Sequence, residues 1–209
     1  MTNGKFITLE GGEGAGKSTQ VKRLAEFLRG KGIEVVQTRE VGGSPSAEAI
    51  REFWLHKGEG YWDALSELLL IMAARREHLT KTILPALARG AWVISDRFAD
   101  STRAYQGIGL GLGLEAVEEI YRRIAPDFEP DLTLLLDLPV DAGLSRMTAR
   151  GGQDDRYQQK DRVFHQTLRD AYLSLARTYA QRFRVIDASG DQAAVSGLIE
   201  ETVRGHFSL

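Results

Sequence analysis

A glycine-rich motif of eight residues near the start of the chain limits the possible folds more than any other feature. Residues 11–18 read Gly-Gly-Glu-Gly-Ala-Gly-Lys-Ser, which matches the pattern G-x-x-x-x-G-K-[S/T] in full. A short run of residues that favour β-strands, at residues 6–9, precedes the motif, and a helical pattern of apolar residues begins at Ser18. A strand, a glycine-rich loop and a helix in this order predict an α/β fold that binds a nucleotide triphosphate.

The chemistry of this loop follows from its backbone. Glycines let successive N–H groups point into one hollow, and the following helix adds the positive end of its dipole. Lys17 is placed to reach the β- and γ-phosphates. The residues predicted to bind the triphosphate are Gly11, Gly12, Glu13, Gly14, Ala15, Gly16, Lys17, Ser18 and Thr19.

The motif alone leaves a GTPase, a motor ATPase and a small-molecule kinase open. The chain has no Asn-Lys-x-Asp sequence, which reads guanine in GTPases, and its 209 residues leave little room for a motor module. Both absences favour a kinase.

Strand-like and helix-like segments alternate along the chain. The predicted strands are residues 6–9, 33–36, 92–95, 132–136 and 185–186, and the predicted helices are 18–29, 47–56, 64–88, 164–179 and 195–203. Pro85 is expected to kink the far end of the long helix. This alternation predicts a single domain over residues 1–209, with a five-stranded parallel sheet covered by helices on both faces.

Composition excludes several other classes of function. The net charge of -2 gives no general attraction to nucleic acid or to an anionic membrane. Without cysteine the chain has no disulfide, no thiolate zinc site and no cysteine nucleophile, and its four histidines show no metal-ligand spacing. Neither a signal peptide nor a membrane span is evident, so we expect a cytoplasmic protein without nucleic-acid or membrane partners.

Arginines follow two of the predicted strands. Arg97 comes after the strand at residues 92–95, Arg39 follows the second strand, and Arg75 lies on the long helix. The carboxyl ends of parallel strands meet at one edge of a sheet, so these arginines are expected near the phosphate loop. Like charges gather where an anion offsets their repulsion, so the cluster predicts a second anion site.

A magnesium site is predicted at the same edge. The hydroxyl of Ser18 is a ligand for the metal in loops of this kind. Asp96, at the end of the third strand, is placed to bind Mg²⁺ directly or through a water molecule.

A second group of arginines flanks a polar, glycine-containing insert. Arg146 and Arg150 precede residues 151–155, and Arg156 follows them. This composition is typical of a lid, which we place at about residues 148–160. A lid arginine close to a transferring phosphoryl group is worth about 10³–10⁵ in rate.

No histidine or isolated carboxylate is placed as a general base. A sugar hydroxyl as acceptor would require a base to take its proton. A phosphate acceptor, with a second pKa of about 6, is already largely dianionic at neutral pH. The absence of a base therefore favours a phosphate acceptor.

These motifs resemble those of the thymidylate kinase family, bacterial type, which belongs to the P-loop nucleoside-monophosphate kinase fold. The resemblance extends from residue 9 to about residue 160 and rests on residues 9–19, Thr38-Arg39-Glu40 with Gly42-Gly43, Ala73-Ala74-Arg75, Pro85-Ala86-Leu87, Asp96-Arg97-Phe98, Ser101-Thr102, Ala104-Tyr105-Gln106-Gly107, Pro130-Asp131-Leu132-Thr133 and Asp155-Arg156.

The resemblance implies ATP as the donor, dTMP as the acceptor, Mg²⁺ between them and a homodimer. Arg39 and Arg97 would hold the dTMP phosphate, with Glu40 beside the sugar, and Tyr105 would disfavour a ribose. Arg51, Ile71, Arg75, Thr102 and Gln106 would surround the thymine. Glu13 together with lid arginines resembles the bacterial subtype. The residues expected to take part in phosphoryl transfer are Glu13, Lys17, Asp96, Arg97, Arg150 and Arg156.

The sequence departs from the family pattern at four positions. Ile71 replaces a phenylalanine that stacks on thymine, and Val41 replaces a proline. Leu110 stands where the family has an arginine, and Gln158 where a glutamate is common. Two alternatives therefore stay open: a kinase for another pyrimidine nucleotide or a deoxynucleoside, and a nucleotide-binding protein with impaired catalysis.

Overall fold

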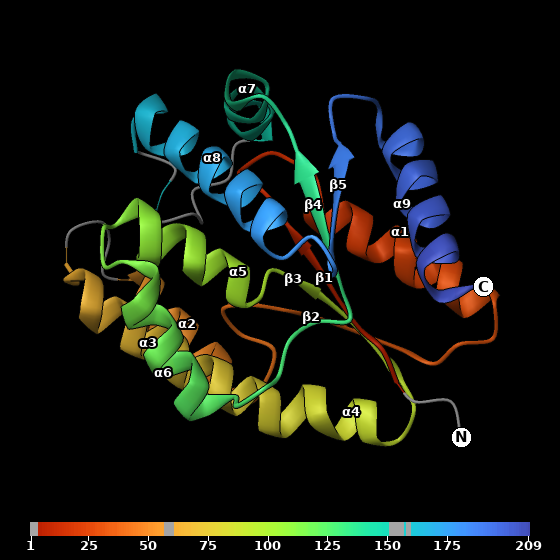
Figure 1. Cartoon of the computed structure of the whole chain (residues 1–209), viewed down its shortest axis with the longest axis horizontal. Helices are drawn as coiled ribbons and strands as arrows, with labels where there is room; N and C mark the ends of the chain where they lie inside the picture. The colour runs from red at the N-terminus through yellow and green to blue at the C-terminus, as the bar shows by residue number, and fades with distance from the viewer. Residues whose placement is uncertain (1–3, 57–60, 151–156, 158–159) are drawn as a thin grey trace.

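A five-stranded parallel sheet forms the centre of the protein (Figure 1). The computed structural model of the chain describes residues 4–56, 61–150, 157 and 160–209. The strands are β1 (Phe6–Glu10), β2 (Val35–Arg39), β3 (Trp92–Asp96), β4 (Leu132–Asp137) and β5 (Phe183–Asp187), in the order β2-β3-β1-β4-β5. The predicted parallel sheet is confirmed.

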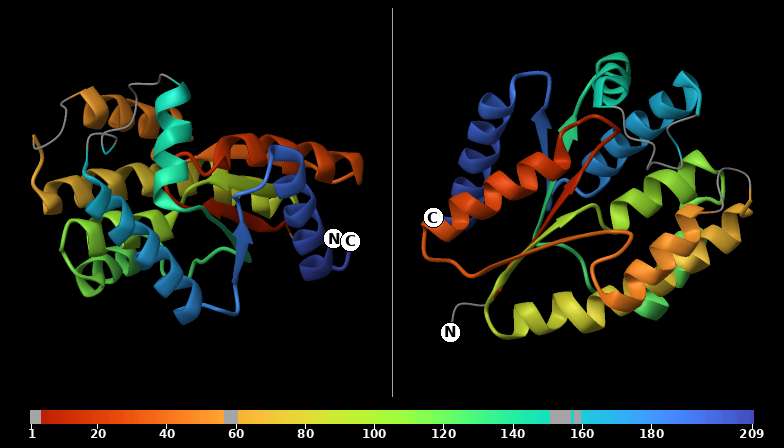
Figure 2. Two further views of the ribbon diagram at one scale, coloured as in Figure 1. Left: turned by 90° about the horizontal axis from the view of Figure 1, so that it is seen from above. Right: turned by 180° about the vertical axis from the view of Figure 1, so that it is seen from behind.

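Helices cover both faces of this sheet (Figure 2). The helices are α1 (Lys17–Gly30), α2 (Pro45–His56), α3 (Ala64–His78), α4 (Leu84–Ala88), α5 (Ala99–Thr102), α6 (Leu114–Ile124), α7 (Val140–Arg150), α8 (Arg162–Thr178) and α9 (Gln192–Phe207), with π-helical segments η1 (Leu79–Ile83) and η2 (Arg103–Gly109). Helices α1 and α9 pack on one face, and α3, α4, α6 and α8 pack on the other. None of the helices in the described ranges is long and apolar enough to cross a lipid bilayer.

The alternation of side chains along β1 explains the two cores. Ile7 and Leu9 point to the α1 and α9 face, where they join Leu24 and Val195. Phe6 points to the opposite face, among residues of α3 and α6. The two polar residues of this fully buried strand, Thr8 and Glu10, both have hydrogen-bond partners.

Two of the differences between the predicted and the observed elements have a local structural explanation. The second strand begins at Val35 rather than at residue 33, because the chain leaves α1 through Gly32 (φ 79°) and pairs with β3 only from Val35 onward. The single helix predicted over residues 64–88 is divided by η1, one turn before Pro85. Proline has no N–H and its ring crowds the carbonyl four residues earlier, which explains a widened turn at this place.

The leucines and the methionine of α3 lie on two separate faces of the helix. Leu68 and Met72 are buried in the core, whereas Leu65 and Leu69 are about half exposed. The helical segments over residues 99–124 were not predicted. Those at 99–109 contain two glycines that argue against a helix, but Val117 and Tyr121 show the spacing of a buried helix face in α6.

Candidate active site

A cavity of about 440 Å³ opens at the carboxyl edge of the sheet, between the phosphate loop and helices α2, α3 and η2. Every residue predicted to bind the acceptor nucleotide lines it: Arg39, Glu40, Arg51, Ile71, Arg75, Arg97, Thr102, Tyr105 and Gln106. Glu13, Gly14, Gly16, Lys17, Ser18 and Thr19 line its other end. The predicted donor and acceptor sites therefore share one cavity, whose volume suits a small-molecule site.

The phosphate loop is shaped by close backbone contact with α7. Gly14 has φ 71°, a left-handed conformation that favours glycine, and a Cβ on it would collide with the carbonyl oxygen of Gly143. A Cβ on Gly143 would in turn lie 2.5 Å from the carbonyl oxygen of Glu13. Two glycines that are distant in sequence are thus required for this loop.

Lys17 is held inside the loop. Its Nζ donates to the carbonyl oxygens of Gly11 (3.0 Å) and Gly12 (2.8 Å). Burial, and then repulsion from Arg97, lower the pKa of this lysine below its usual range. The ammonium group is therefore positioned at the floor of the cavity before any phosphate arrives.

The two predicted metal ligands lie side by side. Ser18 Oγ donates to Asp96 Oδ2 at 2.5 Å, where β3 meets the first turn of α1. In the described part of the chain no group of three or more histidine, cysteine or acidic residues could hold a metal by itself. A hydroxyl and one carboxylate suit Mg²⁺, which takes oxygen ligands and usually completes its shell with water and substrate phosphates.

Arg97 has an unusual backbone conformation. Its φ of 69° is uncommon for a residue with a side chain and costs on the order of 1–3 kcal/mol. Its own N–H donates to the carbonyl oxygen of Leu9 (3.0 Å), and its carbonyl oxygen accepts from Ser95 Oγ (2.7 Å). These bonds help hold a conformation that directs the guanidinium toward the phosphate loop.

The guanidinium of Arg97 connects the two ends of the cavity. On the phosphate-loop side it donates to the carbonyl oxygen of Gly11 (3.2 Å) and to Glu13 Oε1 (2.5 Å). On the opposite side it donates to the hydroxyls of Tyr105 (3.2 Å) and Tyr172 (3.1 Å). Glu13 also accepts from the Tyr105 hydroxyl at 2.5 Å. Glu13 of the phosphate loop and Tyr105 of the predicted acceptor site therefore both help to position Arg97.

Glu10, directly before the loop, is completely buried and was not predicted as a site residue. Its carboxylate accepts from the Phe98 N–H (2.8 Å) and from Ser101 Oγ (2.6 Å), both close to Arg97. Burial and repulsion from Asp100 raise its pKa to about 7, although the Ser101, Arg97 and Phe98 contacts oppose this rise.

The raised pKa of Glu10 predicts a pH-dependent stability. Between pH 4.5, the ordinary pKa, and about pH 7 the folded protein holds a proton that the unfolded chain has lost. The free energy of unfolding should therefore fall as pH rises through this window, by up to about 3 kcal/mol, and Glu10→Gln should remove that slope. Urea unfolding at several pH values measures it, with the exposed Glu34→Gln as control. An identical slope in wild type and Glu10→Gln would contradict the prediction.

The side of the cavity lined by the predicted acceptor residues, the acceptor wall, is built around the buried Arg75. Its Nε donates to Glu40 Oε2 (2.8 Å), and its Nη2 donates to Thr102 Oγ1 (2.7 Å) and to the carbonyl oxygen of Phe98 (3.2 Å). The other oxygen of Glu40 contacts His78 Nδ1 at 2.9 Å. Glu40, which was predicted to lie beside the sugar of the nucleotide, therefore also holds Arg75 in position.

The two other predicted arginines lie at the rim. Arg39 Nη2 donates to Glu48 Oε2 (3.0 Å) on α2, and its side chain is 56% exposed, so it is accessible to an anion. Arg51 Nη1 donates to the carbonyl oxygen of Val41 (2.9 Å).

Aromatic side chains surround the inner end of the cavity. Ile71 lines the wall, but Trp54, Tyr105 and Tyr157 line it as well. Tyr157 packs 4.9 Å from the Tyr105 ring, and its hydroxyl donates to Glu67. Trp54, Glu67 and Tyr157 were missed in the sequence, where only the position of Tyr157 beside Asp155-Arg156 could have indicated it.

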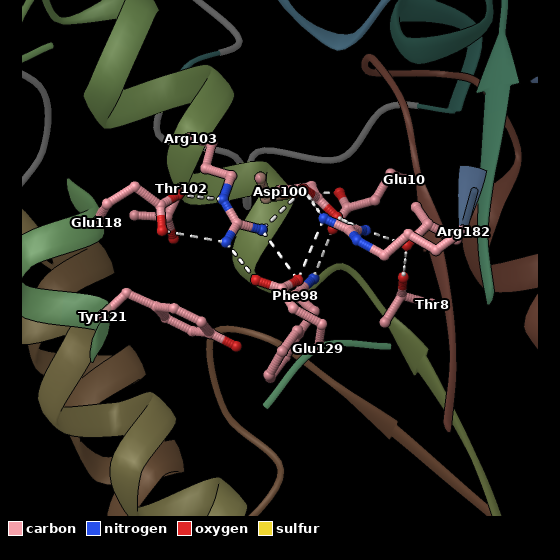
Figure 3. A network of polar contacts seen from close by, with 12 residues as sticks. Thr8, Glu10, Phe98, Asp100, Thr102, Arg103, Glu118, Tyr121, Glu129 and Arg182 are labelled. Atoms are coloured by element: carbon pink, nitrogen blue, oxygen red, sulfur yellow. Dashed lines mark hydrogen bonds and ion pairs between the residues drawn. The ribbon is translucent and has the colours of Figure 1, made fainter. Parts of the chain in front are cut away.

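A partly buried ionic network centred on Asp100 and Arg103 supports the η2 side of the cavity (Figure 3). Asp100 accepts from Arg103 Nη1 (2.9 Å) and from both terminal nitrogens of Arg182 (2.7 and 2.8 Å). Glu129 accepts hydrogen bonds from Arg103 and forms an ion pair with Arg182, and Glu118 accepts from Arg103. The network joins the segment that carries Thr102 and Tyr105 to α6 and to the turn before β5.

Part of the predicted lid lies outside the described residues. This applies to Arg156 and to the side chain of Arg150. Arg146, predicted with them, donates instead to the carbonyl oxygens of Ala188 (3.0 Å) and Ser189 (3.1 Å), in the turn after β5.

Comparison with known proteins gives one consistent result. The family described as "Thymidylate kinase" matches residues 9–199. A thymidylate kinase from Caulobacter vibrioides is 49% identical over the full length of both chains, and one from Pseudomonas fluorescens is 51% identical over 94% of this chain and 93% of its own. The crystal structure of thymidylate kinase from Ehrlichia chaffeensis aligns with a TM-score of 0.78 and 34% identity, covering 96% of this chain and 99% of the other.

Proposed function

The chain belongs to the thymidylate kinase family and phosphorylates dTMP to dTDP, and we propose that the residues of the shared cavity carry out this transfer as follows. The observation that carries the proposal is the position of Arg97, which contacts the phosphate loop on one side and the acceptor wall on the other.

On the donor side, the loop at residues 11–19 binds the ATP phosphates. Lys17 exchanges its bonds to two loop carbonyl oxygens for bonds to the β- and γ-phosphates. Ser18 and Asp96 would hold Mg²⁺, whose charge offsets that of the phosphates during transfer. Glu13 positions Arg97 through its hydrogen bond.

On the acceptor side, Arg97 and the accessible Arg39 bind the dTMP phosphate in line with the donor. Tyr105 lies under Arg97 and faces the sugar, while Arg51, Arg75, Thr102 and Gln106 surround the base. A dianionic phosphate needs no base to remove a proton, so positioning and charge neutralisation supply the catalysis. Arg150 and Arg156 are proposed as the lid arginines of this reaction.

A coupled assay with ATP and a panel of acceptors tests the assignment. dTMP should be turned over with the highest kcat/KM among dTMP, dUMP, UMP, CMP and thymidine. Equal or better turnover of an acceptor without the 5-methyl group or without the 5′-phosphate would replace dTMP by that substrate. Binding of ATP without turnover of any nucleoside monophosphate would favour a catalytically impaired protein.

We further propose that the protein is a homodimer in the cytoplasm. Leu65 and Leu69 on α3, with Phe53 on α2, are each about half exposed and offer an apolar surface to a second copy. Sedimentation equilibrium tests the dimer, since the mass should be twice that of the 23.2 kDa chain.

A further inference from the structure

Both amide N–H groups of Gln106 donate hydrogen bonds within a buried triad formed by Gln106, Glu67 and Tyr157. Its Nε2 donates to Glu67 Oε1 (2.7 Å) and to the Tyr157 hydroxyl (2.9 Å), and that hydroxyl donates in turn to Glu67 Oε1. All three residues are at least nine-tenths buried. The donors and acceptors of the triad are consistent in one amide orientation only, because the reversed amide would place its oxygen against a carboxylate oxygen.

This orientation decides what Gln106 can offer to a ligand. Within the part of the chain that the structure describes, no donor bonds to Gln106 Oε1. Gln106 lines the cavity, so a bound base meets a carbonyl oxygen there and not an amide N–H. The residue therefore acts as a fixed hydrogen-bond acceptor.

Arg75 supplies the complementary donor. Its Nε and Nη2 are bonded to protein oxygens, whereas the partner that the described residues provide for Nη1 is the weak acceptor Met72 Sδ at 3.5 Å. An N–H of Arg75 Nη1 is thus available in the wall that Gln106 also lines. A donor beside an acceptor matches the edge of thymine or uracil, where a carbonyl oxygen lies beside N3–H, whereas cytosine presents the reverse order.

We propose that Glu67 and Tyr157 are positioning residues that set the selectivity for 4-oxo over 4-amino pyrimidines by fixing the amide of Gln106. The inference rests on the proposed function, because it assigns the base end of the cavity to the acceptor nucleotide. A site built around a ligand N–H discriminates strongly against an analogue that lacks it, since its buried polar group is then left unpaired.

The test compares kcat/KM for dTMP and dCMP in wild type, Glu67→Gln and Tyr157→Phe. A glutamine at position 67 can present either oxygen or N–H to Gln106, so the amide is free to reverse. The ratio of kcat/KM for dTMP to that for dCMP should fall by about 10-fold or more, chiefly through KM for dTMP. Tyr157→Phe keeps the carboxylate and should lower the ratio by about 2- to 10-fold.

Glu77→Gln provides a matched control on the same helix, because Glu77 contacts Ser46 at the surface and lies outside the cavity wall. Its ratio should equal that of wild type, and KM for ATP should stay the same in every variant. An unchanged ratio in Glu67→Gln and Tyr157→Phe, with wild type preferring dTMP, would overturn this inference alone. Wild type without dTMP turnover would instead contradict the proposed function.

Discussion

Arg97→Ala should lower kcat for dTMP phosphorylation by about 10³-fold or more, in the range reported for arginines that neutralise a transferring phosphoryl group. The variant loses the guanidinium that links Gly11 and Glu13 to Tyr105 and Tyr172. It keeps a side chain at the position with φ 69°, so the backbone cost is similar in both proteins. Steady-state kinetics with varied dTMP measure the loss.

Two comparisons isolate the role of this guanidinium. The affinity for ATP, measured by calorimetry, should change little in Arg97→Ala, because Lys17 and the loop amides remain. Arg97→Lys should recover only part of the activity, since an ammonium cannot reproduce the forked contacts. The exposed Arg89→Ala serves as a control for loss of one positive charge. Wild-type turnover by Arg97→Ala would refute the assignment.

Asp100→Asn should destabilise the protein by about 3–5 kcal/mol, because it removes the fully buried carboxylate that pairs with the buried Arg103 and with the largely buried Arg182. Asp100 has no exposed surface, and three hydrogen bonds from Arg103 and Arg182 reach its carboxylate. Burial alone would raise the pKa of this carboxyl, but the contacts with Arg182 and Arg103 outweigh burial and lower it. Urea unfolding at pH 7 measures the loss.

The pH dependence of the loss of stability in Asp100→Asn shows whether the charge of the Asp100 carboxylate is its cause. Since the folded pKa of Asp100 lies below the ordinary 3.8, the stabilisation is complete above about pH 5 and should decrease as the pH falls below that value. Asp141→Asn is the control, because Asp141 forms an ion pair with Arg162 in which both side chains are more than half exposed. Such pairs contribute about 0–1 kcal/mol. Equal effects of the two substitutions would contradict the role of burial.

The parts of the fold that local pattern determines were predictable. The motif at residues 11–18 and the leucine-rich run at 132–136 identify their elements directly, and all residues predicted to bind the acceptor line one cavity. The order of the strands was not predicted, because alternation along the chain does not specify which strands are neighbours. The single domain and the lid boundaries remain predictions.

The parts of the site that were missed depend on contacts between distant residues. Glu67 and Tyr157 are separated by 90 positions, and Asp100 and Arg182 by 82. In sequence, Glu67 is one polar residue near a helix start, and nothing local distinguishes it from a solvated one. Arg146 shows the reverse error: its place among other arginines indicated a lid, but its contacts are with the turn after β5.

The contact between Gly14 and Gly143 has a consequence for how such a motif is defined. The eight-residue motif does not by itself determine the shape of the phosphate loop, because the opposing backbone belongs to α7, more than a hundred residues downstream. A homologue with an intact motif and a bulky residue in place of Gly143 could not keep this loop shape. A sequence pattern used to find divergent members of the family should therefore include the glycine at position 143. A design that transfers the loop to another scaffold should also provide a glycine opposite it.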